Sequence, residues 1–555
     1  MSASSGTVAT PSYLEIVAGF DMDDELALLR MDDGGAVNAA ELCCTRHASD
    51  PDRVALRHRA PDGATRDWTF AELDRASSRF AAVLRDLGVT KGDRVAGLLP
   101  RTAELLVTIL ATWRIGAVYQ PLFTAFGPKA IEHRLKLADT RVVVADAANR
   151  PKLADLDTQA ATVIVGAAAG SGDRDFWSAI NEQAGGIAPV RLALDDPFLM
   201  MFTSGTTGLP KPLFVPLRAI ACFVLYMRHA IDLRADDRFW NLADPGWAYG
   251  LYWAVIGPLA MGMTTVFHEG GFSVESTYDT IVEYGITNLT GSPTAYRQFL
   301  AAGPEKAARV KGRLRVVSSA GEPLNPEVIR WFDQHLDVAI HDHYGQTELG
   351  MVVCNHHGLS HPVRIGSAGY ALPGYRVVIL SPDDRELGVG EPGELALDLA
   401  QSQLMWFTGY MGRDTPALTG AYFRSGDMAE LNDDGSISFL GRSDDVITTS
   451  GYRVGPFDVE SALLEHPAVV ESAVIGKPDP ERTEIIKAFV VLRPEYEPGP
   501  ALAEELRLHV RSCLSAHAYP REIVFVTDLP KTPSGKVQRF LLRQQEIAQQ
   551  PAAAS

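Results

Sequence analysis

A glycine- and hydroxyl-rich run at residues 201–216 has the clearest potential for chemistry, and it reads MFTSGTTGLPKPLFVP. Its glycines allow the backbone to turn and to approach a ligand closely. The hydroxyls, the backbone N–H groups and Lys211 can together bind phosphate oxygens. A Walker loop needs Ser or Thr directly after its lysine, and Pro212 stands there instead. A hydroxyl-rich surface loop is the other interpretation of this composition.

Four further side chains could act on a nucleotide or on its phosphates. Asp427 can accept two hydrogen bonds at once, which suits the vicinal hydroxyls of a ribose. Glu348 offers a hard oxygen ligand for Mg²⁺, and Arg442 presents a fixed fork of donors to phosphate or ribose oxygens. Lys536 carries a positive charge in a loop bent by prolines and a glycine. Each residue alone also fits an ordinary turn or solvated position. The surrounding sequence must therefore decide between that and a nucleotide-binding role.

Five segments, in this order along the chain, supply that surrounding sequence. They are residues 201–216, 319–328 (SAGEPLNPEV), 341–350 (HDHYGQTELG), 422–460 and 529–539 (LPKTPSGKVQR). Together they resemble the adenylate-forming (AMP-binding) superfamily, which includes acyl-CoA synthetases, aryl-CoA ligases, luciferase-like enzymes and the adenylation domains of nonribosomal synthetases. In the general pattern of its segments, the sequence most resembles bacterial short- and medium-chain acyl-CoA synthetases.

This resemblance implies an AMP-forming acid–thiol ligase. Such an enzyme joins a carboxylic acid to ATP as an acyl-adenylate, releases pyrophosphate, and then passes the acyl group to the thiol of coenzyme A. ATP, coenzyme A and Mg²⁺ are therefore the implied cofactors, and a small carboxylic acid is the implied substrate. The resemblance assigns catalysis to Lys536, Thr347 and Glu348, and it assigns the metal to Thr207 and Glu348.

The resemblance also implies the nucleotide contacts and a moving C-terminal domain. The implied ATP- and AMP-binding residues are Thr203, Ser204, Gly205, Thr206, Thr207, Lys211, Gly321, Glu322, Pro323, Asp342, His343, Tyr344, Gly345, Gln346, Thr347, Asp427, Arg442 and Lys536. Lys536 and an incoming thiol cannot both occupy the carboxyl end of one pocket. The family solves this by rotating the small domain about a hinge, which corresponds to Asp444 here. That rotation would bring up the coenzyme A residues Ser450, Gly451, Tyr452 and Arg453.

The acyl pocket is expected to be lined by Trp247, Tyr249, Gly250, Gly321 and Gly345. Acetyl-CoA synthetases of the family carry a tryptophan where Gly345 stands. A missing indole leaves room for more than two carbons. We therefore expect an acid longer than acetate, of short or medium chain, with hydroxy-, keto- and aryl-substituted acids also open.

Three other interpretations compete with the ligase. An adenylation enzyme that loads a carrier protein is the nearest, and the absence of a carrier motif after residue 540 lowers it. A silent nucleotide- or acyl-binding protein is disfavoured because Lys211, Glu348, Asp427, Arg442 and Lys536 occur together. The third is a light-emitting oxidative relative, which is disfavoured because nothing in the sequence indicates luciferin chemistry. Separately, the irregular spacing of the histidines and cysteine of residues 341–357 favours pocket and polar positions over a zinc site.

These residues must be positioned by an α/β fold. Strands alternate with helices through the first 340 residues, which predicts parallel-rich sheets covered by helices. From about residue 365 to 443, short strands separated by Gly, Pro and Asp turns predict a small β-rich subdomain. We therefore expect a large N-terminal domain at residues 1–443, for AMP and acyl binding. Residues 444–555 are expected to form a small, mobile α+β C-terminal domain.

Composition limits the partners of this chain. Its 51 Lys+Arg and 69 Asp+Glu give a net charge of −18 over 555 residues, which argues against binding nucleic acid or an anionic membrane. Five scattered cysteines and the absence of a signal peptide favour a reducing compartment, hence the cytoplasm. Residues 247–267 lack charge, but their glycines and Pro258 favour a buried helix and strand over a membrane span. A monomer or a homodimer is expected.

Overall fold

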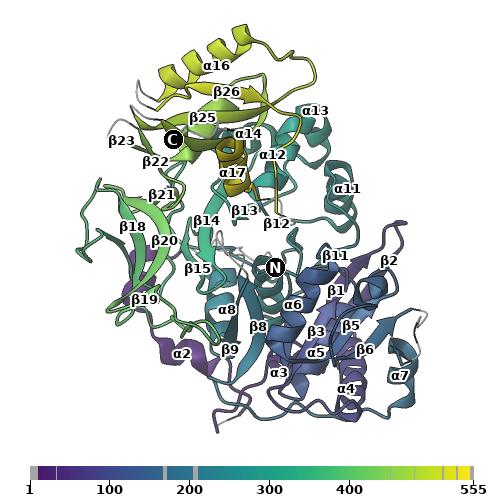
Figure 1. The fold of residues 1–555 in the computed structure, drawn as a ribbon. Helices are drawn as coiled ribbons and strands as arrows, with labels where there is room; N and C mark the ends of the chain where they lie inside the picture. The colour runs from purple at the N-terminus through teal and green to yellow at the C-terminus, as the bar shows by residue number, and fades with distance from the viewer. Residues whose placement is uncertain are drawn as a thin grey trace, which may run out of the picture.

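The protein is described by a computed structural model over residues 10–32, 34–166, 170, 172–203, 210–449, 452–479, 482–514, 518–532 and 536–549. Its chain follows the predicted alternation of strands and helices, and it divides into several sheets (Figure 1). The predicted α/β class, with parallel-rich sheets, is confirmed.

A seven-stranded sheet forms the first layer, in the order β7-β6-β5-β3-β4-β8-β9. Its neighbours are parallel except β9, which runs antiparallel to β8. The strands are β3 (Arg94–Leu98), β4 (Val118–Pro121), β5 (Thr140–Asp146), β6 (Ala161–Val165), β7 (Arg174–Asp175), β8 (Pro197–Thr203) and β9 (Lys211–Pro216). The helices packed against it are α5 (Ala103–Arg114), α6 (Pro128–Ala138) and α7 (Phe176–Glu182). The central strands are buried along most of their length, as expected for a parallel sheet covered on both faces.

A six-stranded sheet forms the second layer, in the order β10-β12-β13-β14-β15-β16. The first four strands are parallel to one another, β15 runs antiparallel to β14, and β16 runs antiparallel to β15. Its strands are β10 (Phe239–Asn241), β12 (Asn288–Gly291), β13 (Val316–Ala320), β14 (Ile340–Gln346), β15 (Gly350–Cys354) and β16 (Tyr370–Ala371). The neighbouring helices are α8 (Ala219–His229), α11 (Val274–Tyr284), α12 (Pro293–Ala302) and α14 (Pro326–Leu336).

Local sequence fixes where several helices begin and end. Helix α4 (Phe70–Asp86) starts at a capping box in which the Thr69 hydroxyl accepts from the Glu72 N–H, and the Glu72 carboxylate accepts from the Thr69 N–H. Helix α11 ends at Gly285, whose φ of +61° places it in the left-handed region that glycine adopts without penalty. Helix α4 lies beside a small sheet of β1 (Val54–Arg59), β2 (Thr65–Thr69) and β11 (Thr265–His268).

Residues 247–267 form the buried helix and strand that the sequence predicts. The helical part consists of α9 (Ala248–Gly250), a π-helical turn η3 (Leu251–Ile256) and α10 (Gly257–Ala260), and β11 follows. The residues of η3 are all buried, and all except Ala254 belong to the main core. Within the described residues, no helix has the length and apolar character needed to span a bilayer.

A β-rich sheet and a separate α+β unit complete the fold. The sheet is antiparallel, with β17 (Val377–Leu380), β18 (Gly393–Asp398), β20 (Tyr422–Leu431) and β19 (Leu418–Thr419) in order, and β21 (Ile437–Arg442) on β20. The α+β unit contains β22 (Ile447–Thr449), β23 (Tyr452–Val454), β24 (Val469–Asp479), β25 (Thr483–Leu492), β26 (Glu522–Phe525), α15 (Pro456–Leu464), α16 (Pro500–Cys513) and α17 (Arg539–Gln549).

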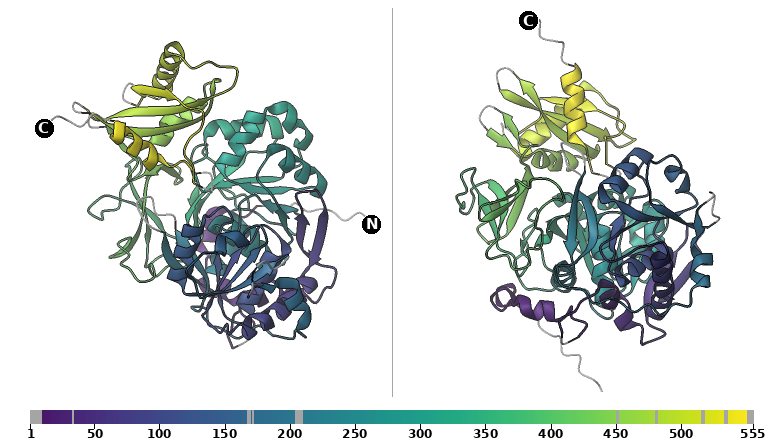
Figure 2. Two further views of the ribbon diagram at one scale, coloured as in Figure 1. Left: turned by 45° about the vertical axis from the view of Figure 1, so that its right-hand side comes forward. Right: turned by 60° about the horizontal axis from the view of Figure 1, so that its bottom comes forward.

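The α+β unit has a hydrophobic core of its own. That core joins β22, β24 and β25 to α15 and α16, separately from the core of the larger part of the protein. Both views of Figure 2 show this unit as a distinct body, in light green to yellow, against the larger one. The protein therefore has a large N-terminal and a smaller C-terminal domain. We keep the boundary at residues 443/444 as a proposal.

Candidate active site

A cavity of about 1470 Å³ lies where the parallel strands of both large sheets end. Pro121 and Thr203 reach it from β4 and β8, and Ala320 and Gln346 reach it from β13 and β14. The carboxyl ends of parallel strands are where open α/β sheets bind their ligands. Residues of β20, of β21 and of the C-terminal domain close the other sides. The fold thus brings segments that are far apart in sequence to one cavity.

Most of the predicted site residues line this cavity. They are Thr203, Lys211, Trp247, Tyr249, Gly321, Glu322, Pro323, Asp342, His343, Tyr344, Gly345, Gln346, Thr347, Glu348, Asp427, Arg442, Asp444 and Lys536. The predicted residues Ser204, Gly205, Thr206, Thr207, Ser450 and Gly451 lie outside the described residues. Tyr452 and Arg453 lie in β23, which pairs with β22.

Gly250 does not line the cavity. A Cβ at this position would collide with the backbone carbonyl of Asp244, so close packing between α9 and the preceding turn requires the glycine. The placement of Gly250 in the acyl pocket stays a prediction, while its close packing on the Asp244 backbone gives a separate reason for a glycine here.

Strand pairing places Asp427 and Arg442 opposite each other on β20 and β21. The Arg442 guanidinium donates to Asp427 Oδ1 at 3.0 Å, and Tyr344 Oη and Gln346 Nε2 donate to Oδ2 at 2.5 and 2.8 Å. Burial raises the pKa of Asp427, although Arg442 acts in the opposite direction. Because each carboxylate oxygen has two lone pairs, this oriented side chain can still accept from ligand hydroxyls.

Glu348 is a buried carboxyl group on the cavity wall. Tyr410 Oη donates to its Oε1 at 2.6 Å, and the Lys211 ammonium lies 4.8 Å from the centre of the Tyr410 ring. Burial raises the pKa of Glu348, while the Tyr410 hydrogen bond and the charges of Lys211 and Arg442 act in the opposite direction. A divalent cation would stabilise the ionised form of such a group, so the residues present fit a magnesium ion.

Lys536 approaches the cavity from the C-terminal domain. Its backbone N–H donates to the Thr532 hydroxyl at 3.1 Å, and its carbonyl accepts from the Thr532 N–H at 2.7 Å. Lys531 anchors the base of the loop through an ion pair with Glu471 at 2.7 Å. The exposed Lys536 lines the same cavity as Asp427, which belongs to the other domain.

Contacts between α14 and α15 hold the two domains in this arrangement. Asn325 Nδ2 donates to the Ser461 hydroxyl at 2.9 Å, and Arg330 lies 3.4 Å from a carboxylate oxygen of Glu465. At the predicted hinge, the Arg442 guanidinium lies 3.4 Å from Asp444. The contacts named here are polar, as is common between domains that move relative to each other.

The histidine-rich run packs as neutral structural side chains. His341 stacks on His357 with ring centres 3.7 Å apart, and burial lowers the pKa of His341 to about 4. His343 lies 2.7 Å from the Tyr226 hydroxyl and 3.0 Å from the Asn355 carbonyl oxygen, and burial lowers its pKa to about 3. The rings of His341 and His343 thus both lie within hydrogen-bonding distance of the Asn355 carbonyl oxygen, and His343 also faces the cavity.

Two family models match the chain along most of its length. The model of the AMP-binding enzyme matches residues 44–410, and that of the AMP-binding enzyme C-terminal domain matches residues 458–536. The chain belongs to the AMP-binding enzyme family.

Relatives and solved structures of this AMP-binding enzyme cover nearly the whole chain. An acetyl-coenzyme A synthetase of Bacillus subtilis (strain 168) is 38% identical over 97% of this chain and 95% of its own. The mitochondrial acyl-coenzyme A synthetase ACSM4 of Rattus norvegicus is 35% identical over 86% of this chain and 84% of its own. The crystal structure of the Brucella canis acyl-CoA synthetase is 58% identical, with a TM-score of 0.79, over 98% of this chain and 100% of that one. The anthranilate CoA ligase AuaEII in complex with anthranoyl-AMP is 28% identical, with a TM-score of 0.84, over 92% and 98%.

Several cavity residues of this AMP-binding enzyme were missed by sequence reasoning. Phe123 and Phe126 follow β4 and pack against Trp247, with ring centres 5.5 and 5.4 Å apart. Tyr410, which holds Glu348, was missed as well. The two phenylalanines directly follow a predicted strand of a parallel sheet, and that position is a usable signal. Tyr410 lies in an irregular stretch of the chain, where the sequence offers no such signal.

Proposed function

We propose that this protein is an AMP-forming acyl-CoA synthetase, which converts a carboxylic acid, ATP and coenzyme A to acyl-CoA, AMP and pyrophosphate. One observation carries the proposal: Asp427, Glu348 and Lys536 converge on a single cavity from three separate parts of the fold. The likeness to acyl-CoA synthetases over nearly the full chain supports the same reaction.

In the first step, the acid attacks the α-phosphorus of ATP. Carboxylic acids are ionised at neutral pH, so this attack needs no general base. Its barrier is the approach of one anion to another and the charge that develops on the phosphate. Lys536 would place a positive charge at that point, while Asp427 and Arg442 orient the ribose. Magnesium, bound through Glu348 and Thr207, would neutralise triphosphate charge.

In the second step, the thiol of coenzyme A replaces AMP on the acyl group. Lys536 lines the cavity in the present arrangement, which suits the first step. We propose that the C-terminal domain rotates about Asp444, which breaks the contacts of Asn325 and Arg330 with α15. Rotation would then bring the segment of residues 450–453 to the cavity.

The acid is proposed to be longer than acetate and of short or medium chain, with aromatic and substituted acids as the alternative. The aromatic wall of Phe123, Phe126 and Trp247 supports an apolar acyl group. The reason for Gly345 differs from the one that we expected. A Cβ there would collide with the Gly350 carbonyl oxygen across the β14–β15 pair, so close strand packing alone already requires a glycine.

A pyrophosphate-release screen tests the proposal. Acids from acetate to medium-chain fatty acids, together with benzoate and anthranilate, are offered with ATP, with and without coenzyme A. We expect acid-dependent pyrophosphate release, and acyl-CoA when coenzyme A is present. Adenylation without transfer to coenzyme A would instead favour a carrier-protein acceptor. No acid-dependent release from any acid would favour a silent binding protein.

The cytoplasm remains our proposed location, in keeping with five unpaired cysteines.

A further inference from the structure

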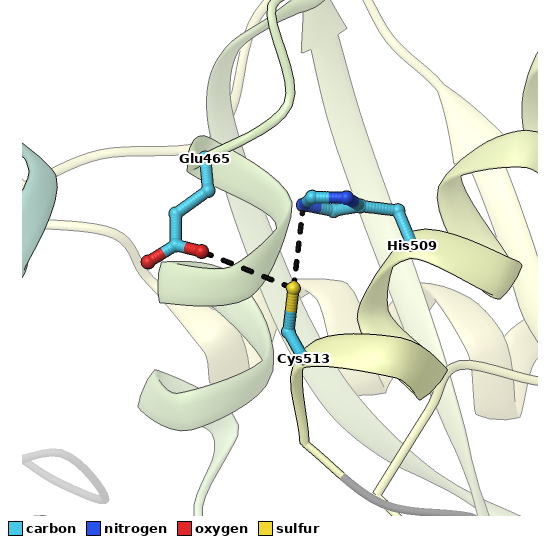
Figure 3. Close-up of side chains that lie close together, drawn as sticks. All are labelled: Glu465, His509 and Cys513. Carbon is cyan, nitrogen blue, oxygen red and sulfur yellow. Dashed lines mark hydrogen bonds between the residues drawn. The ribbon is translucent and has the colours of Figure 1, made fainter.

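The C-terminal domain brings a glutamate, a histidine and a cysteine together on its surface, away from the cavity. His509 and Cys513 lie one turn apart on α16, and Glu465 follows α15 (Figure 3). One ligand atom from each lies within 4.8 Å of the other two, and this is the only such group of three found among the described residues. None of the three lines the cavity.

The two distances from the Cys513 sulfur are close to those of a tetrahedral zinc site. Cys513 Sγ lies 3.7 Å from His509 Nε2 and 3.9 Å from Glu465 Oε2. Zinc bonds of about 2.3 Å to sulfur and about 2.1 Å to nitrogen or oxygen set such ligand pairs about 3.6 Å apart in a tetrahedron. The ligand atoms of His509 and Glu465 lie within 4.8 Å of each other, and the His509 ring would turn from the Ala462 carbonyl oxygen on binding.

The ligand types also favour zinc over harder cations. Thiolate and imidazole suit zinc, whereas calcium and magnesium take oxygen ligands almost exclusively. Glu465 and Cys513 are exposed, so an ion has access to the group and water can supply a fourth ligand. Of the five cysteines, Cys513 alone is exposed, which leaves the other four out of reach of metal ions.

We propose that Glu465, His509 and Cys513 form a zinc-binding site in the C-terminal domain. Binding would release the thiol proton of Cys513 to solvent and leave a thiolate on the metal. His509 Nε2 would exchange its contact with the Ala462 carbonyl oxygen, at 3.0 Å, for the metal, with the ring proton on Nδ1. The other oxygen of Glu465 faces Arg330 of the N-terminal domain, so the site adjoins a contact between the domains.

Metal titration of the full-length, metal-free enzyme tests this site. Zinc affinity is measured by competition with a chromophoric chelator, and Co²⁺ is added separately to detect thiolate-to-metal absorption. We expect one zinc ion per chain, an affinity reduced at least tenfold in both Cys513→Ser and His509→Gln, and thiolate absorption that Cys513→Ser abolishes. Glu504→Gln, an exposed carboxylate on the same helix, should bind like the wild type.

The proposal does not rest on ligase activity, and its failure can be recognised separately. Near-ultraviolet circular dichroism verifies that each variant is folded, and two independent ligand variants guard against a single misfolded one. Equal zinc affinity in the wild type, Cys513→Ser and His509→Gln would overturn the site. So would the absence of thiolate absorption when the wild type binds Co²⁺.

Discussion

At the scale of single residues, the site depends on charges whose partners are set by the fold. Asp427 is buried and receives hydrogen bonds from Arg442, Tyr344 and Gln346, which fix its orientation before any ligand arrives. Lys536 is exposed on a loop and lines the cavity from the other domain. Preorganised charges of this kind stabilise a transition state without reorganisation at the moment of reaction.

Lys536→Ala should reduce acyl-adenylate formation by about 10²- to 10³-fold, since it removes a positive charge from the reacting phosphate. Thioester formation from supplied acyl-adenylate should remain near the wild-type rate. The two half-reactions are measured separately, with Lys129→Ala, an exposed lysine away from the cavity, as the control. Equal loss of both half-reactions would remove Lys536 from the first step.

Asp427→Asn should raise the KM for ATP by about tenfold or more, because hydrogen bonds to a charged group contribute about 1.5–3 kcal/mol. The amide retains the shape of the side chain, so the fold should be unchanged. Initial rates over a range of ATP concentrations measure the effect. An unchanged KM for ATP would place the ribose elsewhere.

At the scale of elements, glycines and a hinge control how strands and domains approach each other. Gly345 on β14 faces the Gly350 carbonyl so closely that no Cβ fits. Asp444 lies between β21 of the large domain and β22 of the small one, beside Arg442. Both features act through the backbone, and substitutions there test geometry rather than charge.

Gly345→Ala should lower the free energy of unfolding of the N-terminal domain by about 1–3 kcal/mol, as overpacking in a tight interior does. Denaturant unfolding measures this change. Gly271→Ala is the matched control, because a Cβ there would meet nothing within 4 Å and its φ is not in the left-handed region. Equal stability of Gly345→Ala and the wild type would show that the β14–β15 pair can relax.

Asp444→Pro should impair thioester formation more than adenylation, since proline fixes φ at a position proposed to rotate. Asp444→Ala is the matched control, because it removes the carboxylate beside Arg442 and leaves the backbone free. Separate assays of the two half-reactions distinguish the variants. A second step as fast in Asp444→Pro as in Asp444→Ala would contradict the hinge.

Sequence reasoning succeeded where local pattern determines structure. Short β-branched runs such as Val142 to Asp146 became buried parallel strands, and the uncharged stretch at residues 247–267 became a buried helix and strand. It missed the contact of Gly250 with the carbonyl of Asp244 across a turn, and it missed Tyr410, which reaches Glu348 from 62 residues away. Such contacts depend on how elements pack, and neither periodicity nor composition carries that information.

At the scale of the whole molecule, a chain with a net charge of −18 is proposed to bind three polyanions: ATP, pyrophosphate and coenzyme A. Basic side chains that could contact these polyanions line the cavity. Its basic lining residues are Arg101, Arg134, Lys211, Arg297, Arg424, Arg442, Lys536 and Arg539. Among the described residues, ten acidic ones line the same cavity, and Arg297, Arg424, Arg442 and Arg539 form ion pairs with carboxylates, so individual cations rather than a net positive cavity would contact the phosphates.

Acid should destabilise the whole protein through its buried histidines. The pKa of His341 falls from about 6.5 to about 4 in the folded state, so between these values the unfolded chain binds the proton and the folded chain does not. The free energy of unfolding is therefore not reduced by His341 above about pH 6.5, and below that pH this residue lowers it by about 1.4 kcal/mol per pH unit. Urea unfolding of the wild type and His341→Gln at about pH 7.5 and about pH 5.5 measures it. Parallel pH dependences in the two proteins would contradict the assignment.

The acyl-adenylate itself provides the most direct test of the central claim. The enzyme is mixed with ATP and its best acid without coenzyme A, and the bound products are analysed by mass spectrometry. We expect acyl-adenylate and pyrophosphate in equal amounts, and complete conversion of the adenylate to acyl-CoA and AMP once coenzyme A is added. Formation of ADP and phosphate, or acyl-CoA without a preceding adenylate, would contradict the account.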